Sequence, residues 1–176
     1  MAKAVEFLRD SLATPLGEMM IVADRSGHLC GIDWVDHVAR LERLLSLRWG
    51  AVTLVAHADP HGFTTTLQAY FAGDLHVIDS LPINPGGTAF QREVWQALRT
   101  IPCGTTLSYG ALAAQIGRPQ AVRAVGLANG ANAIGVVVPC HRVIGSNGAL
   151  TGYGSGLPRK QWLLAHERGQ TEIFFA

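Results

Sequence analysis

Apolar and polar residues alternate in the first half of the chain in a way that predicts a small sheet. Short runs rich in apolar residues are separated by turn signals such as Ser26-Gly27, which is typical of antiparallel strands. Two further segments have apolar residues at helical spacing, the first of them through Leu41, Leu44 and Leu45. The pattern therefore predicts strands at residues 5–11, 17–23 and 29–34 and helices at residues 37–49 and 63–71.

The second half has the pattern of a mostly helical region. Thr88 and Gln91 form a capping-box sequence ahead of a helix expected at residues 89–100. The β-branched run at residues 134–138 predicts a buried strand. Helices are further expected at residues 109–116, at residues 120–129 and from residue 157 to Gly169, with Pro158 in the first turn of the last one.

Composition excludes several classes of protein. Apolar residues make up 48% of the 176 residues and charged residues 15%, so the chain has enough apolar surface for a packed core and is not disordered. No apolar run approaches the ~20 residues that cross a bilayer. Three cysteines without C-x-x-C spacing, and a first segment without a signal-peptide core, favour a cytoplasmic location.

The distribution of charge divides the chain in two. Residues 1–87 hold six Lys and Arg against ten Asp and Glu (−4), whereas residues 88–176 hold eight against three (+5). The prolines and glycines of residues 81–87 read as a linker between domains at residues 1–80 and 88–176. We therefore expect an α/β (α+β) N-terminal scaffold domain with a small antiparallel sheet, and a mostly α-helical C-terminal domain whose positive charge faces an anionic partner.

Residues 109–129 resemble a helix-turn-helix, because two short helices flank the turn Gly117-Arg118-Pro119. Arg123 is the only charged residue of the second helix, and its neighbours are mostly small. Small residues allow close approach to a surface and one long cation can enter a gap, which favours docking in the DNA minor groove over reading of bases in the major groove. The alternative is that the small residues pack against another helix and Arg123 is solvated.

Cys140 and His141 follow the expected buried strand and Pro139. A cysteine beside a histidine in a basic region is a candidate nucleophile, although a buried cysteine next to an incidental histidine remains the alternative. Adjacent residues of an extended chain point in opposite directions, so we expect a water to relay the Cys140 proton to His141. The spacing does not suit a zinc site, and no metal is expected.

Glu167 is expected in the last turn of the final helix, where the helix dipole disfavours a negative charge. Such an acid needs a compensating partner, and His141 is one candidate; an exposed pair with Arg168 is the other. The glycine-rich segment 145–156 precedes this helix and contains Tyr153. Its backbone amides can approach a ligand closely, although a surface loop is the default interpretation.

Several separated motifs together resemble the O6-alkylguanine-DNA alkyltransferases. They are the sequence Pro139-Cys140-His141-Arg142-Val143, the helix pair before it, and the segments 151–154 and 162–167 after it. The resemblance covers about residues 84–169, and residues 70–73 are similar to the single-polypeptide bacterial branch of that family.

The resemblance implies DNA repair by direct damage reversal. The alkyl group of O6-alkylguanine, and of O4-alkylthymine, moves irreversibly and stoichiometrically to Cys140 after the base is flipped out of duplex DNA bound in its minor groove. No cofactor and no metal are implied, and the expected partner is double-stranded DNA bound by a monomer, with clustering on DNA left open.

The resemblance also assigns roles to single residues. Arg123 fills the gap left by the base, Tyr109 assists the departure of the base, Asn132 pins the turn before the active site, and Glu167, His141 and a water take the Cys140 proton. The remaining residues implied to contact DNA are Gln120, Ala121, Ala124 and Asn129, and those implied to line the substrate pocket are Val143, Tyr153, Gly154 and Ser155.

Two other functions remain open at this point. A non-enzymatic helix-turn-helix protein that binds or senses DNA damage would leave Cys140 silent. A cysteine hydrolase would turn over an ester or peptide, but the basic C-terminal half suits phosphates better than acyl substrates.

Overall fold

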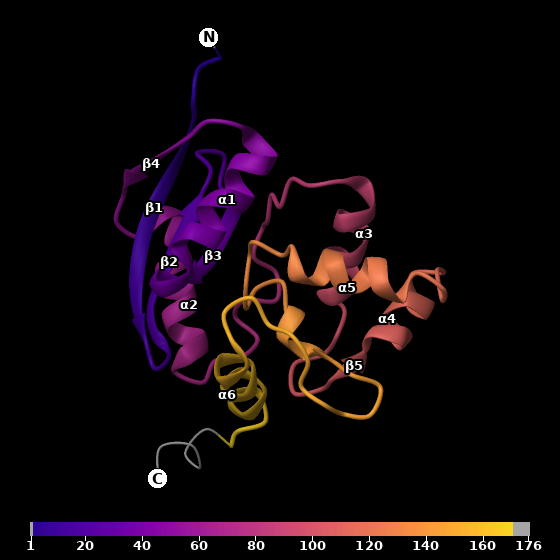
Figure 1. Cartoon of the computed structure of the whole chain (residues 1–176). Coiled ribbons are helices and arrows are strands. Elements are labelled where there is room, and N and C mark those ends of the chain that lie inside the picture. The colour runs from indigo at the N-terminus through magenta and orange to yellow at the C-terminus, as the bar shows by residue number, and fades with distance from the viewer. Residues whose placement is uncertain (1, 171–176) are drawn as a thin grey trace. The chain divides into compact units, whose positions relative to one another are not determined.

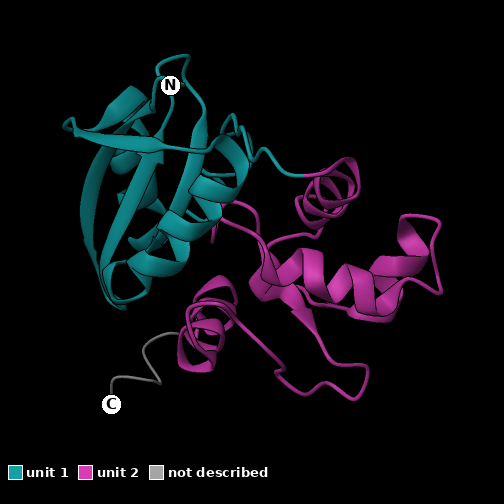
Figure 2. Cartoon of the chain, turned by 45° about the horizontal axis from the view of Figure 1, so that its top comes forward, with its two compact units in different colours: residues 1–87 teal, residues 88–176 magenta. Residues whose placement is uncertain are grey.

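The computed structural model describes residues 2–170, and the chain divides into two compact units, Met1–Gly87 and Thr88–Ala176 (Figure 2). Unit 1 is built on a sheet and unit 2 is mostly helical (Figure 1). Within the described residues, no helix is both long and apolar enough to span a membrane.

Unit 1 contains a four-stranded sheet in the order β3-β2-β1-β4. β1 (Val5–Thr14) pairs with β2 (Gly17–Ala23), and β2 pairs with β3 (Leu29–Trp34), both antiparallel. β4 (Val52–Ala56) pairs with β1 in parallel, so the sheet is mixed and the expectation of an antiparallel sheet was wrong at this edge. The reason is that α1 (Val38–Trp49) returns the chain across the sheet before β4 begins.

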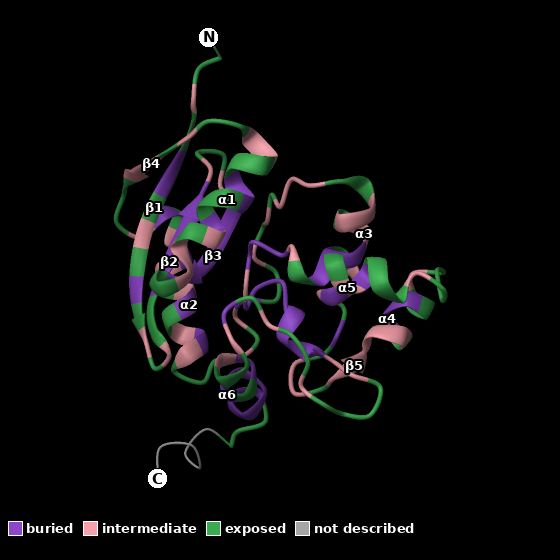
Figure 3. Cartoon of the chain, in the orientation of Figure 1, coloured by how far each residue is buried: buried purple, intermediate pink, exposed green. Residues whose placement is uncertain are grey.

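Two helices and the buried strands form the core of unit 1. β3 is buried along its whole length, and β2 along most of its length (Figure 3). α1 approaches β3 closely at Gly31, where an added Cβ would lie 2.9 Å from Leu41 Cδ1. α2 (Phe63–Phe71) buries Phe63, Leu67 and Tyr70 and contacts β1. Short 3-10 turns precede the two helices, at Val35–His37 and Pro60–Gly62.

Part of the expected linker belongs to unit 1. The Leu29 amide donates to the Pro82 carbonyl at 2.9 Å, and the Asn84 amide donates to the Leu29 carbonyl at 2.7 Å. Residues 82–84 therefore run along β3, the edge strand of the sheet.

In the described part of unit 2, residues 88–170, four α-helices carry most of the structure. α3 (Ala89–Leu98) begins with the expected capping box, in which the Gln91 amide donates to Thr88 Oγ1 at 3.1 Å and the Thr88 amide to Gln91 Oε1 at 2.9 Å. α3 packs on the second helix of the helix pair, where Trp95 Nε1 donates to the Ala128 carbonyl at 2.8 Å. The pair itself is α4 (Tyr109–Gln115) and α5 (Val122–Gly130), and α6 (Leu157–Glu167) closes the unit.

The strand expected at residues 134–138 is absent from the described structure. The segment is buried but folds into turns, with Val136 at φ 72° and the Val138 amide donating to the Ile134 carbonyl at 2.9 Å. The Asn132 side chain supplies hydrogen bonds that a neighbouring strand would otherwise give: its Oδ1 accepts from the Ile134 amide and its Nδ2 donates to the Val138 carbonyl.

A two-stranded parallel sheet lies close in sequence to this turn. β5 (Leu107–Ser108) pairs with β6 (Val143–Ile144), and the 3-10 turn η3 (Cys140–Arg142) leads directly into β6. Cys140 and His141 are therefore in a helical turn rather than in the extended chain that the sequence predicted.

Candidate functional site

Cys140 is held by the side chain of Asn132. Asn132 Nδ2 lies 3.2 Å from Cys140 Sγ and 2.8 Å from the Val138 carbonyl oxygen, and Cys140 is 7% exposed. A hydrogen bond donated to sulfur stabilises the thiolate over the thiol, because the donor interacts more strongly with the charged form. Asn132 thus holds the turn before Cys140 and also contacts the sulfur atom of Cys140.

His141, Arg142 and Glu167 form a buried charged network. His141 Nε2 lies 2.7 Å from Glu167 Oε1, and Arg142 binds the same carboxylate through Nε at 2.9 Å and Nη2 at 2.8 Å. Arg142 Nη1 also donates to the Ile101 carbonyl at 2.8 Å. The carboxylate is fully enclosed, so Glu167 pairs with His141 and Arg142 rather than forming the exposed pair with Arg168.

The electrostatics of this network keep Glu167 ionised. Burial alone would raise the pKa of Glu167, but the charges and hydrogen bonds of His141 and Arg142 outweigh it and hold the pKa well below its ordinary value. His141 Nδ1, on the other side of the ring, is buried and has no hydrogen-bond partner in the described structure. A carboxylate on one ring nitrogen and an open second nitrogen is the arrangement of a histidine that accepts a proton.

Lys160 is a buried cation that the sequence analysis did not single out. Its Nζ donates to the carbonyls of Val143 at 2.6 Å, Thr151 at 3.1 Å and Gly152 at 3.1 Å. Burial lowers the pKa of the Lys160 ammonium, while its interaction with Cys140 opposes that shift. Lys160 therefore ties α6 to β6 and to the glycine-rich loop.

Two signals in the sequence could have revealed these buried cations. Lys160 lies three and four residues before Leu163 and Leu164, on the apolar side of the last helix, where a lysine is uncommon unless it is paired. Arg142 directly follows the candidate nucleophile and its histidine. Neither signal identifies the partner, because the partners are brought in by tertiary contacts.

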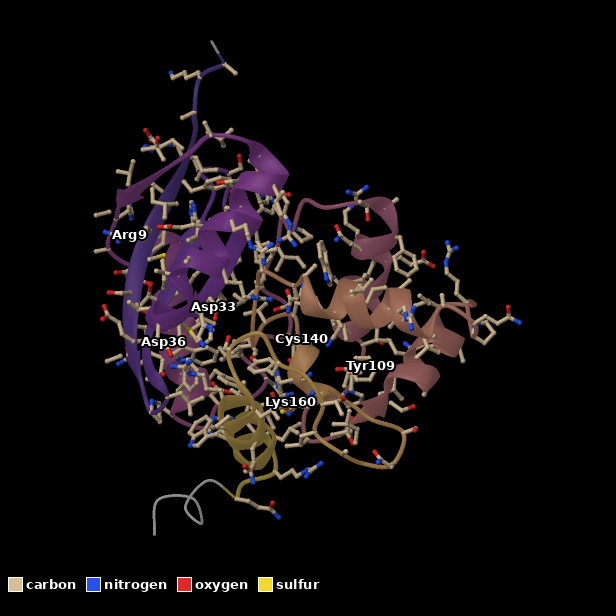
Figure 4. All side chains as sticks on the ribbon, viewed as in Figure 1. Arg9, Asp33, Asp36, Tyr109, Cys140 and Lys160 are labelled. Atoms are coloured by element: carbon tan, nitrogen blue, oxygen red, sulfur yellow. The ribbon has the colours of Figure 1, made fainter. Side chains whose placement is uncertain are left out.

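Tyr109 begins α4 and reaches across to the same loop. Its hydroxyl donates to the Thr151 carbonyl at 3.1 Å, so this carbonyl is shared by Tyr109 and Lys160. Burial raises the pKa of the Tyr109 hydroxyl, the interaction with Cys140 raises it further, and hydrogen bonds with Thr151 and with the Asn129 side chain oppose the rise. Figure 4 labels Tyr109, Cys140 and Lys160, which come from α4, η3 and α6.

The residues expected to contact DNA differ in exposure. Arg123 and Ala124 are exposed on α5, Gln120 is exposed in the turn before it, and Ala121 is half-buried there. Asn129 is buried at 6% exposure and lies beside Tyr109 instead of on the open face. The exposed side of α5, which carries Arg123, also carries Leu127 one turn later. Leu127 is 72% exposed, and the sequence analysis did not include it among the residues expected to contact DNA.

The expected pocket residues lie on the two segments that Lys160 joins. Val143 is buried in β6, Tyr153 is half-buried, Gly154 is exposed and Ser155 is buried. The Val143 carbonyl already accepts a hydrogen bond from Lys160, and the second lone pair of that oxygen can accept another. Within residues 2–170, no group of three His, Cys, Asp or Glu side chains could hold a metal ion.

Comparisons with known proteins agree across both units. Residues 89–169 match the 6-O-methylguanine DNA methyltransferase DNA-binding domain, and residues 8–85 match the ribonuclease-like domain of the same proteins. A methylated-DNA–protein-cysteine methyltransferase from Salmonella typhimurium is 54% identical over 165 residues, which cover 93% of this chain and 96% of the relative. The Mycolicibacterium paratuberculosis protein of the same name is 62% identical over 107 residues, 61% of this chain and 64% of the relative.

Solved structures support the same assignment. The crystal structure of Mycobacterium tuberculosis OGT in complex with DNA matches with a TM-score of 0.77 at 38% sequence identity, and the match covers 98% of this chain and 100% of the other. The resemblance inferred from the motifs around Cys140 is therefore confirmed, as is the α+β fold. This chain belongs to the 6-O-methylguanine DNA methyltransferase family, as do the two methylated-DNA–protein-cysteine methyltransferases that it resembles in sequence.

Proposed function

We propose that the chain repairs duplex DNA by moving the alkyl group of O6-alkylguanine, and of O4-alkylthymine, to Cys140. The observation that carries this proposal is the enclosed network in which Glu167 binds His141 Nε2 while Asn132 Nδ2 faces Cys140 Sγ. The printed title of the Mycobacterium tuberculosis structure names a complex with DNA, which supports DNA as the partner of this chain too. A thiol and a proton acceptor are the groups that alkyl transfer needs.

DNA binding in this proposal uses the open face of α5. Arg123 is exposed there among small residues, which suits insertion into the minor groove and support of the gap that an extruded base leaves. Extrusion is required because the O6–alkyl bond is inaccessible inside the base stack. The base then enters beside Tyr109, and the Cys140 and Val143 carbonyls accept hydrogen bonds from its amine.

The chemical step transfers one alkyl group and leaves a thioether. The Cys140 proton passes through a water to His141 Nδ1, and the ionised Glu167 stabilises the histidinium that results. The thiolate attacks the alkyl carbon, an S–C bond forms, and the O6–C bond breaks with its electron pair on the base. Tyr109 donates a hydrogen bond toward a ring nitrogen of the base and stabilises the anion as it leaves. The base then takes up one proton from water, which balances the proton that passed from Cys140 to His141.

The thioether makes the protein act once. Nothing in the network provides a second nucleophile for Cys140, and a thioether is stable in water, so each molecule repairs one lesion without a cofactor. None of the three cysteines forms a disulfide, which fits a reducing compartment such as the cytoplasm, where the Cys140 thiol persists.

Transfer of a radiolabelled methyl group from duplex DNA to protein tests this function. Cys140→Ala should abolish labelling and retain binding to the lesion, whereas Cys103→Ala, a control on a half-buried cysteine outside the network, should label as the wild type does. Undiminished labelling of Cys140→Ala would refute the role of Cys140. Binding without any labelling of the wild type would favour a protein that only recognises the damage.

A further inference from the structure

Leu127 is a large apolar side chain on the exposed side of α5. Within the described part of unit 2, the exposed large apolar side chains are Val122, Leu127 and Leu157, and the first two of them lie on α5. A single exposed leucine is common on protein surfaces and needs no explanation by itself. Leu127, however, lies one turn after Arg123, on the surface through which the proposed function binds DNA.

The two sides of Arg123 on the surface of α5 differ in character. In a helix of 3.6 residues per turn, Gly126 lies about 60° to one side of Arg123 and Leu127 about 40° to the other. A Cβ added at Gly126 would lie 4.0 Å from Tyr109 Cδ1, so the glycine side of Arg123 is the side that faces Tyr109. Leu127 therefore lies on the side of Arg123 that is turned away from Tyr109.

DNA is the occupant that this exposed surface fits. Residues 88–176 carry a net charge of +5, and α5 itself contains Arg123 and no Asp or Glu. A basic surface that also exposes a large apolar side chain matches the minor groove, where proteins press apolar side chains against base steps beside their cationic contacts. Leu127 thus continues the surface that Arg123 begins.

The position of Tyr109 indicates which DNA strand Leu127 meets. A helix that lies in the minor groove has one strand along each of its two sides. In the proposed function the damaged base is extruded beside Tyr109, so the damaged strand runs along the Gly126 side of α5. The complementary strand, with the base that has lost its partner, then runs along the Leu127 side.

We propose that Leu127 is a positioning residue that packs on the orphaned base of the complementary strand while Arg123 occupies the gap in the damaged strand. Contact with the base removes the exposed leucine from water and holds the opposite strand in place when the lesion leaves the stack. This proposal rests on the proposed function and adds that repair depends on an apolar contact with the strand opposite the lesion.

The test varies the strand opposite the lesion. Methyl transfer from O6-methylguanine is measured in single turnover below saturation, in a duplex with cytosine opposite the lesion, in a duplex with an abasic site opposite it, and in a single strand. The wild type is compared with Leu127→Ala, with the volume-conserving Leu127→Met, and with Leu47→Ala. Leu47 is the matched control, because it is also 72% exposed but lies on α1 of unit 1.

Leu127→Ala should be about tenfold slower than the wild type on the duplex with cytosine, because it lacks most of the apolar surface that the contact buries. On the duplex with an abasic site and on the single strand the two rates should agree within about twofold, because the orphaned base is absent from both. Leu127→Met and Leu47→Ala should follow the wild type on all three DNAs. The change of the rate ratio from one DNA to another is independent of the fraction of each variant that folds.

Two results would overturn the proposal. A rate ratio that is the same on all three DNAs would show that Leu127 does not contact the complementary strand and serves the fold, the damaged strand or a protein partner. A tenfold ratio that persists opposite the abasic site would show that the contact is not with the orphaned base. Failure of the wild type to transfer methyl from any of the three DNAs would instead overturn the proposed function.

Discussion

Replacement of Glu167 by glutamine should strongly destabilise unit 2. The carboxylate accepts three hydrogen bonds, one from His141 and two from Arg142, and all three side chains are buried. Glutamine keeps the shape but removes the charge, so the buried Arg142 guanidinium loses its anionic partner, and the NH₂ group of glutamine takes the place of one of the two oxygens that accepted hydrogen bonds. Breaking a buried ion pair in this way costs about 3–5 kcal/mol, which corresponds to about 10 °C in the melting temperature of a chain of this size.

Glu93→Gln is the matched control, because Glu93 pairs with Arg118 at 3.2 Å on the exposed surface of the same unit. An exposed pair contributes at most about 1 kcal/mol, so this variant should unfold at nearly the wild-type urea concentration. Urea unfolding at neutral pH, followed by circular dichroism, measures both changes. Equal small losses in the two variants would refute the reasoning that burial makes the Glu167 network strong.

The difference in stability between the wild type and Glu167→Gln should depend on pH. The pKa of Glu167 is held below its ordinary value of 4.5 in the folded chain, so its contribution to stability is complete above pH 4.5 and is lost as the pH falls toward the folded pKa. The difference in stability between the wild type and Glu167→Gln should therefore be largest near neutral pH and shrink in acid. A difference that grows as the pH falls below 4.5 would contradict the assigned direction of the pKa shift.

Two further substitutions test DNA binding and the loop. Arg123→Ala should slow repair of duplex DNA more than repair of single strands, because only a duplex has a base stack with a gap to fill. If the guanidinium contacts a phosphate, the slope of log Kd against log salt should also fall by about one. An equal loss of rate on both substrates would exclude a role for Arg123 in filling the gap. Lys160→Met should remove one donor from each of three carbonyls of β6 and the glycine-rich loop, of which the Thr151 carbonyl keeps its bond from Tyr109. The unfolding free energy should fall by about 1–3 kcal/mol, and the amides of residues 151–152 should exchange hydrogen faster. Unchanged exchange at those amides would show that Lys160 does not hold the loop.

Local rules predicted the elements whose signals are local. The strand at residues 17–23, the strand at residues 29–34 and the helix at residues 63–71 have the predicted bounds, and the Thr88 capping box forms as its spacing indicated. Local rules failed at residues 134–138, where β-branched residues read as a strand. The side chain of Asn132 makes hydrogen bonds with the backbone of that segment. The pattern of apolar residues cannot predict such a bond, because it depends on a single polar side chain.

The sequence pattern did not predict the strand β4 or the buried roles of Arg142 and Lys160, and the cause is the same for both. β4 is not alternately buried and exposed in a regular way, because its position is fixed by parallel pairing with β1 across a helix. Glu167 could be expected to need a partner, since a negative charge at a helix C-terminus is unfavourable. Arg142 and Lys160 could not be placed, because their acceptors come from segments distant in sequence, such as Ile101 and Thr151.

Mass spectrometry of the protein after reaction with duplex DNA containing O6-methylguanine tests the central claim most directly. The account predicts one added methyl group per molecule, located by peptide mapping on Cys140, with unmodified guanine recovered in the DNA and no further turnover when the lesion is in excess. A methyl group on Cys103 or Cys30, or continued repair by a protein that stays unmodified, would contradict it.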